Sequence, residues 1–352
     1  MRVVITGATG NVGTSLVRAL GADERVDEIV GVARRRPELS LPKTTWAQAD
    51  VEADAARLPE LFAGADAVVH LAWLIQPSRD LRELRRVNVD GSRAVFEAAA
   101  AAGVGTLVHA SSIGAYSPGP KDTPVDERWP TGGVHSSFYS RHKSEAERLL
   151  DAVAAANSGM RVVRLRPGLI FKGESASEIR RYFAGPFLPS PLVRPAFLRV
   201  MPAMPRLVLQ GVHADDIAQA YRLVVTDASA EGAYNVAADP VITPDTLARE
   251  FGAVKVPLPP KLVRAFADLT WRARLQPTPP GWLDMGLEVP VMDTSRIKAL
   301  GWTPQRTSLQ ALRELLEGMS RGQGYDTPPL DPKTSGPGRS RELLTGVGRV
   351  NP

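Results

Sequence analysis

Two side chains capable of acid–base chemistry lie four residues apart in the segment YSRHK: Tyr139 and Lys143. On a helix, this spacing places both side chains on one face. A phenol exchanges protons near neutrality only if its pKa falls from about 10, and a nearby ammonium group lowers that pKa by favouring the phenolate. The pair predicts a proton donor and acceptor, although an ordinary amphipathic helix can carry the same two residues.

A second motif opens the chain. The segment TGATGNVG places Gly7, Gly10 and Gly13 between an apolar run at residues 3–5 and a stretch with helical spacing of apolar residues at 12–20. The first N–H groups of a helix favour an anion, and glycine lets the backbone approach a pyrophosphate closely. A Gly-rich turn between two core elements is the alternative that this motif alone leaves open.

A pair of hydroxyl groups follows an apolar run in the segment TLVHASSIGAY. Ser111 and Ser112 stand at the expected carboxyl end of this strand. In a doubly wound sheet, ligands bind at the carboxyl ends of the strands. A serine here can donate a hydrogen bond to a reacting oxygen, or it can simply cap the strand.

The elements that must position these residues follow a regular order. Apolar strands alternate with helical segments through the first half, which predicts an α/β fold with a Rossmann-type, doubly wound parallel sheet. We expect a dinucleotide-binding domain at 1–170. Residues 171–320 should mainly form a smaller C-terminal substrate lobe, with some elements returning to the sheet. Residues 321–352 are rich in Gly and Pro and poor in large apolar side chains, so a disordered and dispensable tail is expected.

Composition limits the function classes. The 352 residues are 43% hydrophobic and 23% charged, contain no cysteine, and carry a net charge of +5. This excludes thiol chemistry and favours a cytoplasmic protein without a cleaved leader, a membrane span or a nucleic-acid surface. The five histidines are scattered, so no metal site is expected. We expect a small-molecule substrate, and the sequence is compatible with a homodimer.

Taken in order, the motifs resemble those of one enzyme superfamily. TGATGNVG, HLAW, VNVDGSRAVFEAA, ASSIGAY, YSRHK, RPG, VHADDIAQA and DTSRIKALGW occur along residues 1–320. This series resembles the extended short-chain dehydrogenase/reductases, in the NAD-dependent epimerase/dehydratase-like branch. The resemblance implies a nicotinamide cofactor and a catalytic Ser/Tyr/Lys set.

The family's residue roles carry over to matching positions. The resemblance makes Tyr139 the general acid/base, Lys143 the ligand of the nicotinamide ribose, and Ser112, rather than Ser111, the catalytic hydroxyl. The resemblance assigns the remaining cofactor contacts as follows: Gly7, Gly10, Asn11, Val12 and Gly13 at the pyrophosphate, Asp50 and Val51 at the adenine, Leu71, Ala72 and Trp73 along the cofactor, Asn88 on the next helix, and Pro167 and Gly168 beside the nicotinamide. Separately, Asp215 or Asp216 in the segment VHADDIAQA is expected to cap the predicted helix IAQAYRLVV, at 217–225.

The end of the second strand bears on the choice of cofactor. Enzymes that prefer NAD commonly place an acid here, whereas this chain has Ala33 followed by Arg34, Arg35 and Arg36. A guanidinium group can bind a 2′-phosphate bidentately. We therefore expect NADP(H) to be preferred, with NAD(H) still allowed; a solvated basic loop would have the same sequence.

Departures from the family pattern narrow the set of reactions that the chain is expected to catalyse. Ile113 and Gly114 follow Ser112 where dehydratases carry an acid pair, and the chain lacks the cysteine of carbon-epimerising synthases. The segment before VHADD is apolar and basic, which suits an apolar substrate or the lobe's own core.

We expect an oxidoreductase that transfers hydride between the cofactor and a carbonyl or secondary alcohol. A sugar 4-epimerase is one alternative. A non-catalytic NADP(H)-sensing regulator is another, although it would not need a proton donor.

Overall fold

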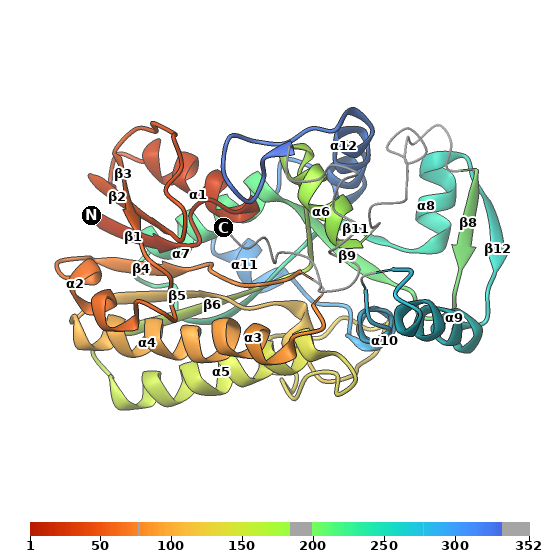
Figure 1. Ribbon diagram of the computed structural model, residues 1–352, viewed down its shortest axis with the longest axis horizontal. Coiled ribbons are helices and arrows are strands. Elements are labelled where there is room, and N and C mark those ends of the chain that lie inside the picture. The colour runs from red at the N-terminus through yellow and green to blue at the C-terminus, as the bar shows by residue number, and fades with distance from the viewer. Residues whose placement is uncertain (77, 184–198, 277, 333–352) are drawn as a thin grey trace.

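The computed structural model describes residues 1–76, 78–183, 199–276 and 278–332. Seven strands form its central sheet: β1 (Arg2–Thr6), β2 (Glu28–Ala33), β3 (Thr44–Gln48), β4 (Ala67–His70), β5 (Thr106–Ala110), β6 (Arg161–Pro167) and β10 (Gly232–Val236). Every neighbouring pair is parallel, in the order β10-β6-β5-β4-β1-β2-β3 (Figure 1). The predicted Rossmann-type sheet is confirmed, and its strand order reverses between β1 and β4, where such sheets bind ligands.

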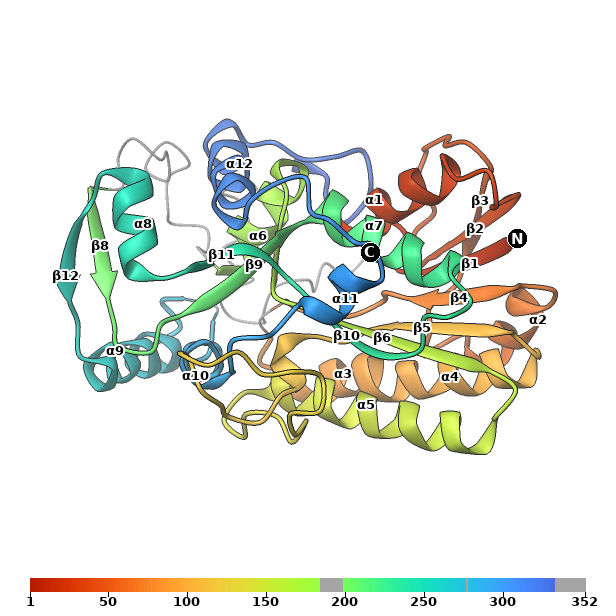
Figure 2. The ribbon, with the colours of Figure 1, turned by 180° about the vertical axis from the view of Figure 1, so that it is seen from behind.

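Helices cover both faces of this sheet (Figures 1 and 2). One face carries α1 (Asn11–Gly21), α7 (Ala214–Thr226) and α11 (Ser295–Ala299). The opposite face carries α2 (Leu58–Phe62), α4 (Gly91–Ala101) and α5 (Phe138–Ala156), with α3 (Leu81–Arg85) joined to α4 by the π-helical turn Arg86–Asp90. Alternate residues of β1 point into the two cores: Val3 and Ile5 pack with Leu16, and Val4 packs with Phe96. Burial on both faces explains the continuous apolar runs of these strands.

Two smaller sheets belong to the C-terminal lobe. The first contains β7 (Leu169–Phe171), β9 (Leu209–His213) and β11 (Ala238–Ile242), and it packs against α6 (Ala176–Phe183) and α12 (Ser308–Arg321). The second pairs β8 (Val200–Ala203) with β12 (Val254–Pro257); α8 (Pro244–Phe251), α9 (Pro260–Arg272) and α10 (Gly281–Glu288) complete the lobe. Figures 1 and 2 both place β8, β12, α8 and α9 at the end of the molecule farthest from β1–β3.

Residues after α12 turn back onto the first half of the chain. Thr327 Oγ1 donates a 2.8 Å hydrogen bond to the carbonyl of Thr9 in the Gly-rich loop, and the side chain of Leu330 is fully buried. Residues 322–332 belong to the tail predicted to be disordered at 321–352, yet they contribute a buried apolar side chain and a specific hydrogen bond, so we treat their order as a question for the truncation experiment below. The rest of the predicted tail, 333–352, lies outside the described residues.

Candidate active site

The Gly-rich loop joins β1 to α1 at the carboxyl edge of the sheet. Gly7 has a φ of +75°, and a Cβ there would lie 2.6 Å from the backbone nitrogen of Ala72. A Cβ on Gly13 would lie 2.4 Å from the carbonyl oxygen of Gly7, so close packing requires glycine at both positions. A Cβ on Gly10 would make only an ordinary 3.5 Å contact. Packing within the protein therefore does not explain Gly10, which leaves room at the start of α1.

The first turn of α1 offers unused polar groups. Gly10 occupies the N-cap position, so no side chain caps the helix. The Oδ1 atom of Asn11 is buried and, within the described part of the chain, has no hydrogen-bond partner. Exposed N–H groups and the positive end of the helix dipole favour an anion at this position. The N–H groups and the helix dipole fit the pyrophosphate of a dinucleotide, with Val12 in the same turn, whereas the Asn11 oxygen is an acceptor and fits a hydroxyl or N–H donor.

The end of β2 brings basic residues beside the predicted adenine contacts. Arg34 is exposed, and its Nε atom lies 3.9 Å from the carboxylate of Asp50. The other carboxylate oxygen of Asp50 accepts hydrogen bonds from two backbone N–H groups of the following turn. Val51 is buried against Gly91 of α4. Arg34 and Asp50 thus lie together at the edge of the sheet, and Arg35 is exposed on the same loop.

The segment after β4 is held against the Gly-rich loop. Leu71 donates its N–H to the carbonyl of Thr6, and Ala72 contacts Gly7. The side-chain amide of Asn88 accepts a 2.7 Å hydrogen bond from the N–H of Leu74 and donates a 2.9 Å bond to its carbonyl. Both ends of the Asn88 amide are therefore engaged, and this residue positions the segment that carries Leu71, Ala72 and Trp73.

Ser112 and Tyr139 meet at the carboxyl end of β5. Ser112 follows the strand, its Oγ atom accepts a 3.0 Å hydrogen bond from the N–H of Gly114, and its side chain is close enough to the Tyr139 phenol to lower the pKa of that phenol. Burial raises the pKa of Tyr139 to about 12, against the smaller, opposite effect of Ser112. The expectation that Lys143 lowers this pKa is not met in the structure, because desolvation of the phenol dominates.

Lys143 lies one turn after Tyr139 on α5. Its ammonium group donates a 2.6 Å hydrogen bond to the carbonyl of Ala110 and lies 3.4 Å from the centroid of the Trp73 ring. The distance to the Tyr139 ring centroid is 5.9 Å. Burial lowers the pKa of Lys143 well below its usual range, with Glu147 opposing this shift. The Ala110 bond uses one of three ammonium hydrogens, which fits a further ligand with hydroxyl groups.

A buried carboxylate that the sequence analysis missed supports this corner of the site. Glu147 is 1% exposed and forms a two-pronged ion pair with Arg166 of β6, at 2.5 and 2.8 Å. It also accepts a hydrogen bond from Ser111. Ser111 is therefore engaged in a structural contact, which leaves Ser112 as the hydroxyl beside Tyr139. The spacing Tyr139, Lys143, Glu147, at successive helical turns, is the signal that could have revealed Glu147.

Apolar and aromatic side chains enclose the phenol. The ring centroid of Trp282, on α10, lies 4.9 Å from that of Tyr139, and the Trp73 ring centroid lies 6.2 Å away. Met285 of α10 belongs to the same buried cluster, together with Leu74. The sequence analysis missed Trp282 and Met285, since α10 carries no recognised motif and reaches the site only through the tertiary fold.

Pro167 and Gly168 complete the same edge. Pro167 ends β6, and the N–H of Gly168 donates a 3.0 Å hydrogen bond to the carbonyl of Val236. A Cβ on Gly168 would lie 2.4 Å from the carbonyl of Gln210, so close approach of β9 requires glycine here. The carboxyl ends of β1, β2, β3, β4, β5 and β6 thus gather the predicted site residues along one edge of the sheet.

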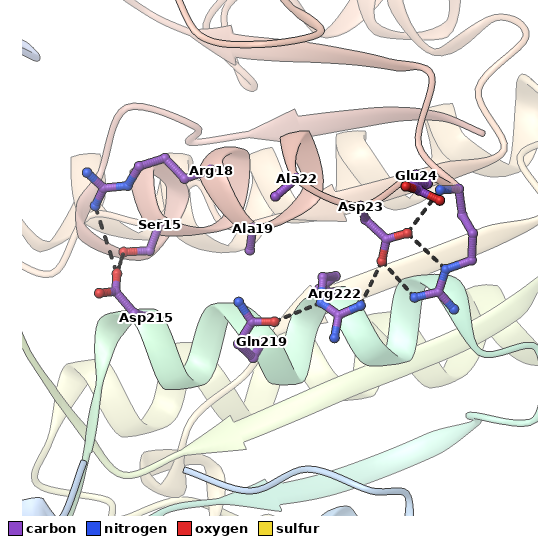
Figure 3. Close-up of a pocket in the computed structure, with 10 residues that line it drawn as sticks. Ser15, Arg18, Ala19, Ala22, Asp23, Glu24, Asp215, Gln219 and Arg222 are labelled. Atoms are coloured by element: carbon purple, nitrogen blue, oxygen red, sulfur yellow. Dashed lines mark hydrogen bonds and ion pairs between the residues drawn. The ribbon is translucent and has the colours of Figure 1, made fainter. Parts of the chain in front are cut away.

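Ion pairs and hydrogen bonds brace α1 against α7 on the outer side of the loop (Figure 3). Ser15 donates a 2.6 Å hydrogen bond to Asp215, and Asp23, just after α1, forms a 2.7 Å ion pair with Arg222 of α7. Arg25 pairs with the same Asp23 carboxylate. The brace fixes the helix whose first turn forms the candidate phosphate site.

The predicted cap of α7 is wrong. The N-cap residue is His213, whose side chain accepts the N–H of Asp215. Asp215 instead binds Ser15 of α1, while the buried carboxylate of Asp216 accepts the N–H groups of Gln305 and Arg306. Both carboxylates join segments distant in sequence, and this tertiary use cannot be read from local capping preferences.

The described ranges contain neither a metal-binding cluster nor a membrane-spanning helix. Within residues 1–76, 78–183, 199–276 and 278–332, no group of three His, Cys, Asp or Glu side chains is arranged to hold a metal ion. Over the same ranges, no helix has the length and apolar character required to cross a bilayer.

Comparison with known proteins places this geometry in context. A model of the NAD dependent epimerase/dehydratase family matches residues 3–178. An uncharacterized protein of Mycobacterium tuberculosis is 28% identical over 273 residues, covering 76% of this chain and 26% of the relative. Sterol demethylase protein B of Methylococcus capsulatus is 30% identical over 175 residues (48% and 52%), and the ceramide reductase of Caulobacter vibrioides is 34% identical over 168 residues (46% and 44%). The chain thus spans about a quarter to a half of these relatives.

Solved structures share the fold at low sequence identity. UDP-glucose 4-epimerase from Thermus thermophilus, in complex with NAD, has a TM-score of 0.63 and 22% identity, covering 91% of this chain and 99% of its own. A short-chain dehydrogenase/reductase superfamily protein from Agrobacterium tumefaciens with bound NAD has a TM-score of 0.67 and 23% identity, covering 91% and 97%. At these identities the likeness concerns the fold alone.

Proposed function

The chain belongs to the NAD-dependent epimerase/dehydratase family, and from that premise we propose that it is an NAD(P)-dependent oxidoreductase acting on a carbonyl or secondary alcohol of an apolar substrate. One observation carries the proposal: Ser112 lies beside the Tyr139 phenol, with Lys143 one helical turn away on α5 and aromatic side chains around the phenol. A regulator that only senses the dinucleotide would not need this proton-donating set.

The chemistry requires a proton at one defined atom. In reduction, the Tyr139 phenol donates its proton to the substrate oxygen, and Ser112 donates a hydrogen bond to the same oxygen. A phenol with the ordinary pKa of about 10 is already protonated at neutral pH, which is the form that reduction needs. With the cofactor bound, the ammonium hydrogens of Lys143 would hold the ribose hydroxyls, and its charge would then oppose the desolvation that disfavours the phenolate. A bound nicotinamide cofactor supplies the hydride.

The cofactor site extends along the carboxyl edge of the sheet. In the proposal, Gly7, Gly10 and the first turn of α1 hold the pyrophosphate, while Asp50 and Val51 face the adenine. Arg34 and Arg35, following Ala33, favour NADP(H) over NAD(H), because guanidinium groups can neutralise a 2′-phosphate. The exposed position of Arg34 at the end of β2 supports this preference.

The substrate is proposed to be apolar. Trp73 and Trp282 are partly buried and pack against the buried cluster that contains Tyr139 and Met285, and these side chains would present little polarity to a nucleotide diphosphate. Two relatives bear the names ceramide reductase and sterol demethylase protein B, and both names refer to lipids. Reduction of a ketone on a lipid-like skeleton best fits the apolar side chains around Tyr139.

A sugar 4-epimerase is the second candidate. The likeness to UDP-glucose 4-epimerase favours it at the level of the fold. The same Ser112, Tyr139 and Lys143 would serve, since epimerisation is an oxidation and a reduction on one retained cofactor. The apolar surroundings of Tyr139 weigh against this candidate.

A paired assay tests the proposal. The purified chain is incubated with NADPH or NADH and a panel of steroid and long-chain aliphatic ketones, and, separately, with UDP-glucose. We expect oxidation of NADPH with an apolar ketone. Tyr139→Phe removes only the phenol hydroxyl, so turnover should fall by about 10²–10⁴-fold while dinucleotide affinity stays nearly unchanged.

Two further variants complete the test. Lys143→Met should weaken both turnover and dinucleotide binding, because the ammonium serves both. Tyr234→Phe, which removes another buried hydroxyl that accepts a hydrogen bond from Glu231, is the matched control and should keep full activity. Wild-type turnover by Tyr139→Phe would exclude the mechanism, and conversion of UDP-glucose alone would favour the epimerase.

A further inference from the structure

Exposed apolar side chains gather on one part of the C-terminal lobe. Among the described residues, ten large apolar side chains are exposed, and eight of them lie between Val200 and Leu275. The eight are Val200, Val254, Val256, Leu258, Leu262, Phe266, Leu269 and Leu275. They belong to β8, β12, α9 and the loops beside them, at the far end of the molecule in Figures 1 and 2. We call this surface the α9 face.

The α9 helix is amphipathic, and its apolar side faces away from the rest of the molecule. Leu262, Phe266 and Leu269 follow one another at helical spacing and are 65–67% exposed. No residue of α9 is fully buried. Its inner side is held by an ion pair from Arg264 to Asp284 of α10, at 2.8 Å, and by Arg79, whose guanidinium lies 3.7 Å from the Trp271 ring centroid. These contacts hold the helix while its apolar stripe faces outward.

The rim of the α9 face is basic. Residues 254–275 contain five cationic side chains, Lys255, Lys261, Arg264, Arg272 and Arg274, and one anionic side chain, Asp268. Three of the five cations form ion pairs with aspartates. Within the described part of the chain, Lys261 and Arg274 have no ion-pair partner. A helix with an apolar stripe and flanking cations matches a membrane surface with anionic headgroups.

This charge pattern separates a membrane from a second copy of the chain. A two-fold dimer through the α9 face would bring the same basic rim of each copy together, so like charges would oppose one another. An anionic lipid surface offers both an apolar layer for the leucine and phenylalanine side chains and negative charge for the rim. We propose that the α9 face docks this protein peripherally on anionic membranes.

Docking would also bring the bilayer near the active site. Asp284 of α10 pairs with Arg264 of α9, and Trp282, two residues earlier on α10, packs on the Tyr139 ring. A membrane under α9 thus lies one helix away from the proposed proton donor. The docking proposal concerns binding only and stands apart from the proposed reaction.

Vesicle sedimentation tests the proposal. The full chain is mixed with vesicles of phosphatidylcholine, alone or combined with phosphatidylglycerol. We expect binding to the anionic vesicles that weakens with added salt. The variant Leu262→Ser/Phe266→Ser/Leu269→Ser should bind at least tenfold less tightly, and Lys261→Ala/Arg274→Ala should lose part of the salt dependence. Leu81→Ser, an exposed leucine outside the α9 face, is the matched control and should bind like the wild type.

Several results would overturn the proposal. One is failure of the wild type to bind anionic vesicles, and another is equal binding by the triple variant. A third is a wild-type dimer in light scattering that becomes a monomer in the triple variant, with no vesicle binding by either, since that identifies a subunit interface. NADPH-dependent reduction measured without vesicles reports on the proposed reaction separately.

Discussion

At the scale of single residues, Lys143 lies in a buried environment that disfavours its charged, protonated form. Its ammonium is buried between the Ala110 carbonyl and the face of Trp73, and burial lowers its pKa well below the usual range. Glu147 opposes this shift, and further polar groups beside the ammonium would favour its charged form more. Hydroxyl groups of a ribose meet this need, so cofactor binding and the charge on Lys143 should reinforce one another.

Cofactor preference is a prediction about two residues. Arg34→Ala/Arg35→Ala should weaken NADPH binding by roughly tenfold or more, because a hydrogen bond to a charged group contributes about 1.5–3 kcal/mol. NADH binding should change little, since NADH lacks the 2′-phosphate. Fluorescence titration with each cofactor measures both constants. Arg36→Ala, the next residue of the basic run, is the control, and an equal loss for both cofactors would contradict the assignment.

The positions of the candidate site residues were more predictable than their electrostatics, whereas their roles stay predictions. Tyr139, Lys143 and Ser112 could be selected because their spacing and their place after strands carry the information. The raised pKa of Tyr139 could not be predicted, since it depends on how deeply the phenol is buried by Trp73 and Trp282. Desolvation is set by side chains that arrive from other parts of the chain.

At the scale of elements, the brace between α1 and α7 fixes the phosphate loop. Asp23 accepts hydrogen bonds from Arg25 and Arg222, and these partners, chiefly Arg25, hold the pKa of its carboxyl well below its usual range. A carboxyl group whose pKa is lowered on folding contributes stability above its unfolded pKa and loses it as the pH falls toward the folded value. The brace should therefore be strong at neutral pH and weaken in acid.

Asp23→Asn tests this brace. We expect a loss of about 1.5–3 kcal/mol in the free energy of unfolding at pH 7, the range for hydrogen bonds to charged groups. The loss should shrink as the pH is lowered below about 4, the ordinary range of an aspartate pKa. Urea unfolding of both proteins at several pH values measures the difference. Glu24→Gln, an exposed neighbour, should have no such effect, and a pH-independent loss would contradict the role of the charge.

Elements of the first half were predictable because β-strands and helices alternate there with clear apolar runs. The second half was less so. The sequence predicted an aspartate as the N-cap of α7, whereas the N-cap residue is His213. Asp215 instead accepts a hydrogen bond from α1, and Asp216 accepts one from the segment before α12. Local preference ranks aspartate highly at a cap, but tertiary hydrogen bonds decided the outcome.

At the scale of the whole molecule, the described end of the chain closes over its beginning. Removing every residue after Arg321 should lower the free energy of unfolding by about 2–4 kcal/mol, from the burial of Leu330 and the hydrogen bond of Thr327. Dinucleotide affinity should fall as well, because Thr327 holds the Gly-rich loop through Thr9. Thermal unfolding and cofactor titration measure the two effects.

A chain that ends at Pro332 is the control for this truncation, since it keeps every contact described for residues 322–332. It should match the full chain in both measurements. If the chain ending at Arg321 is equally stable, the segment adds nothing to the fold and the expectation of a dispensable tail is restored. The sequence could not reveal this contact, because one leucine and one threonine in a Gly- and Pro-rich stretch do not reach the composition of an ordered segment.

The contact between Thr327 and Thr9 spans 318 positions, which sets an order of events during synthesis. The Gly-rich loop is synthesised well before the segment that covers it. At roughly 5–20 residues per second, the loop waits about 15–60 seconds for its cover. A nascent chain can therefore form the β1–α1 turn early, but this turn gains its contact with Thr327 only after that residue has been synthesised.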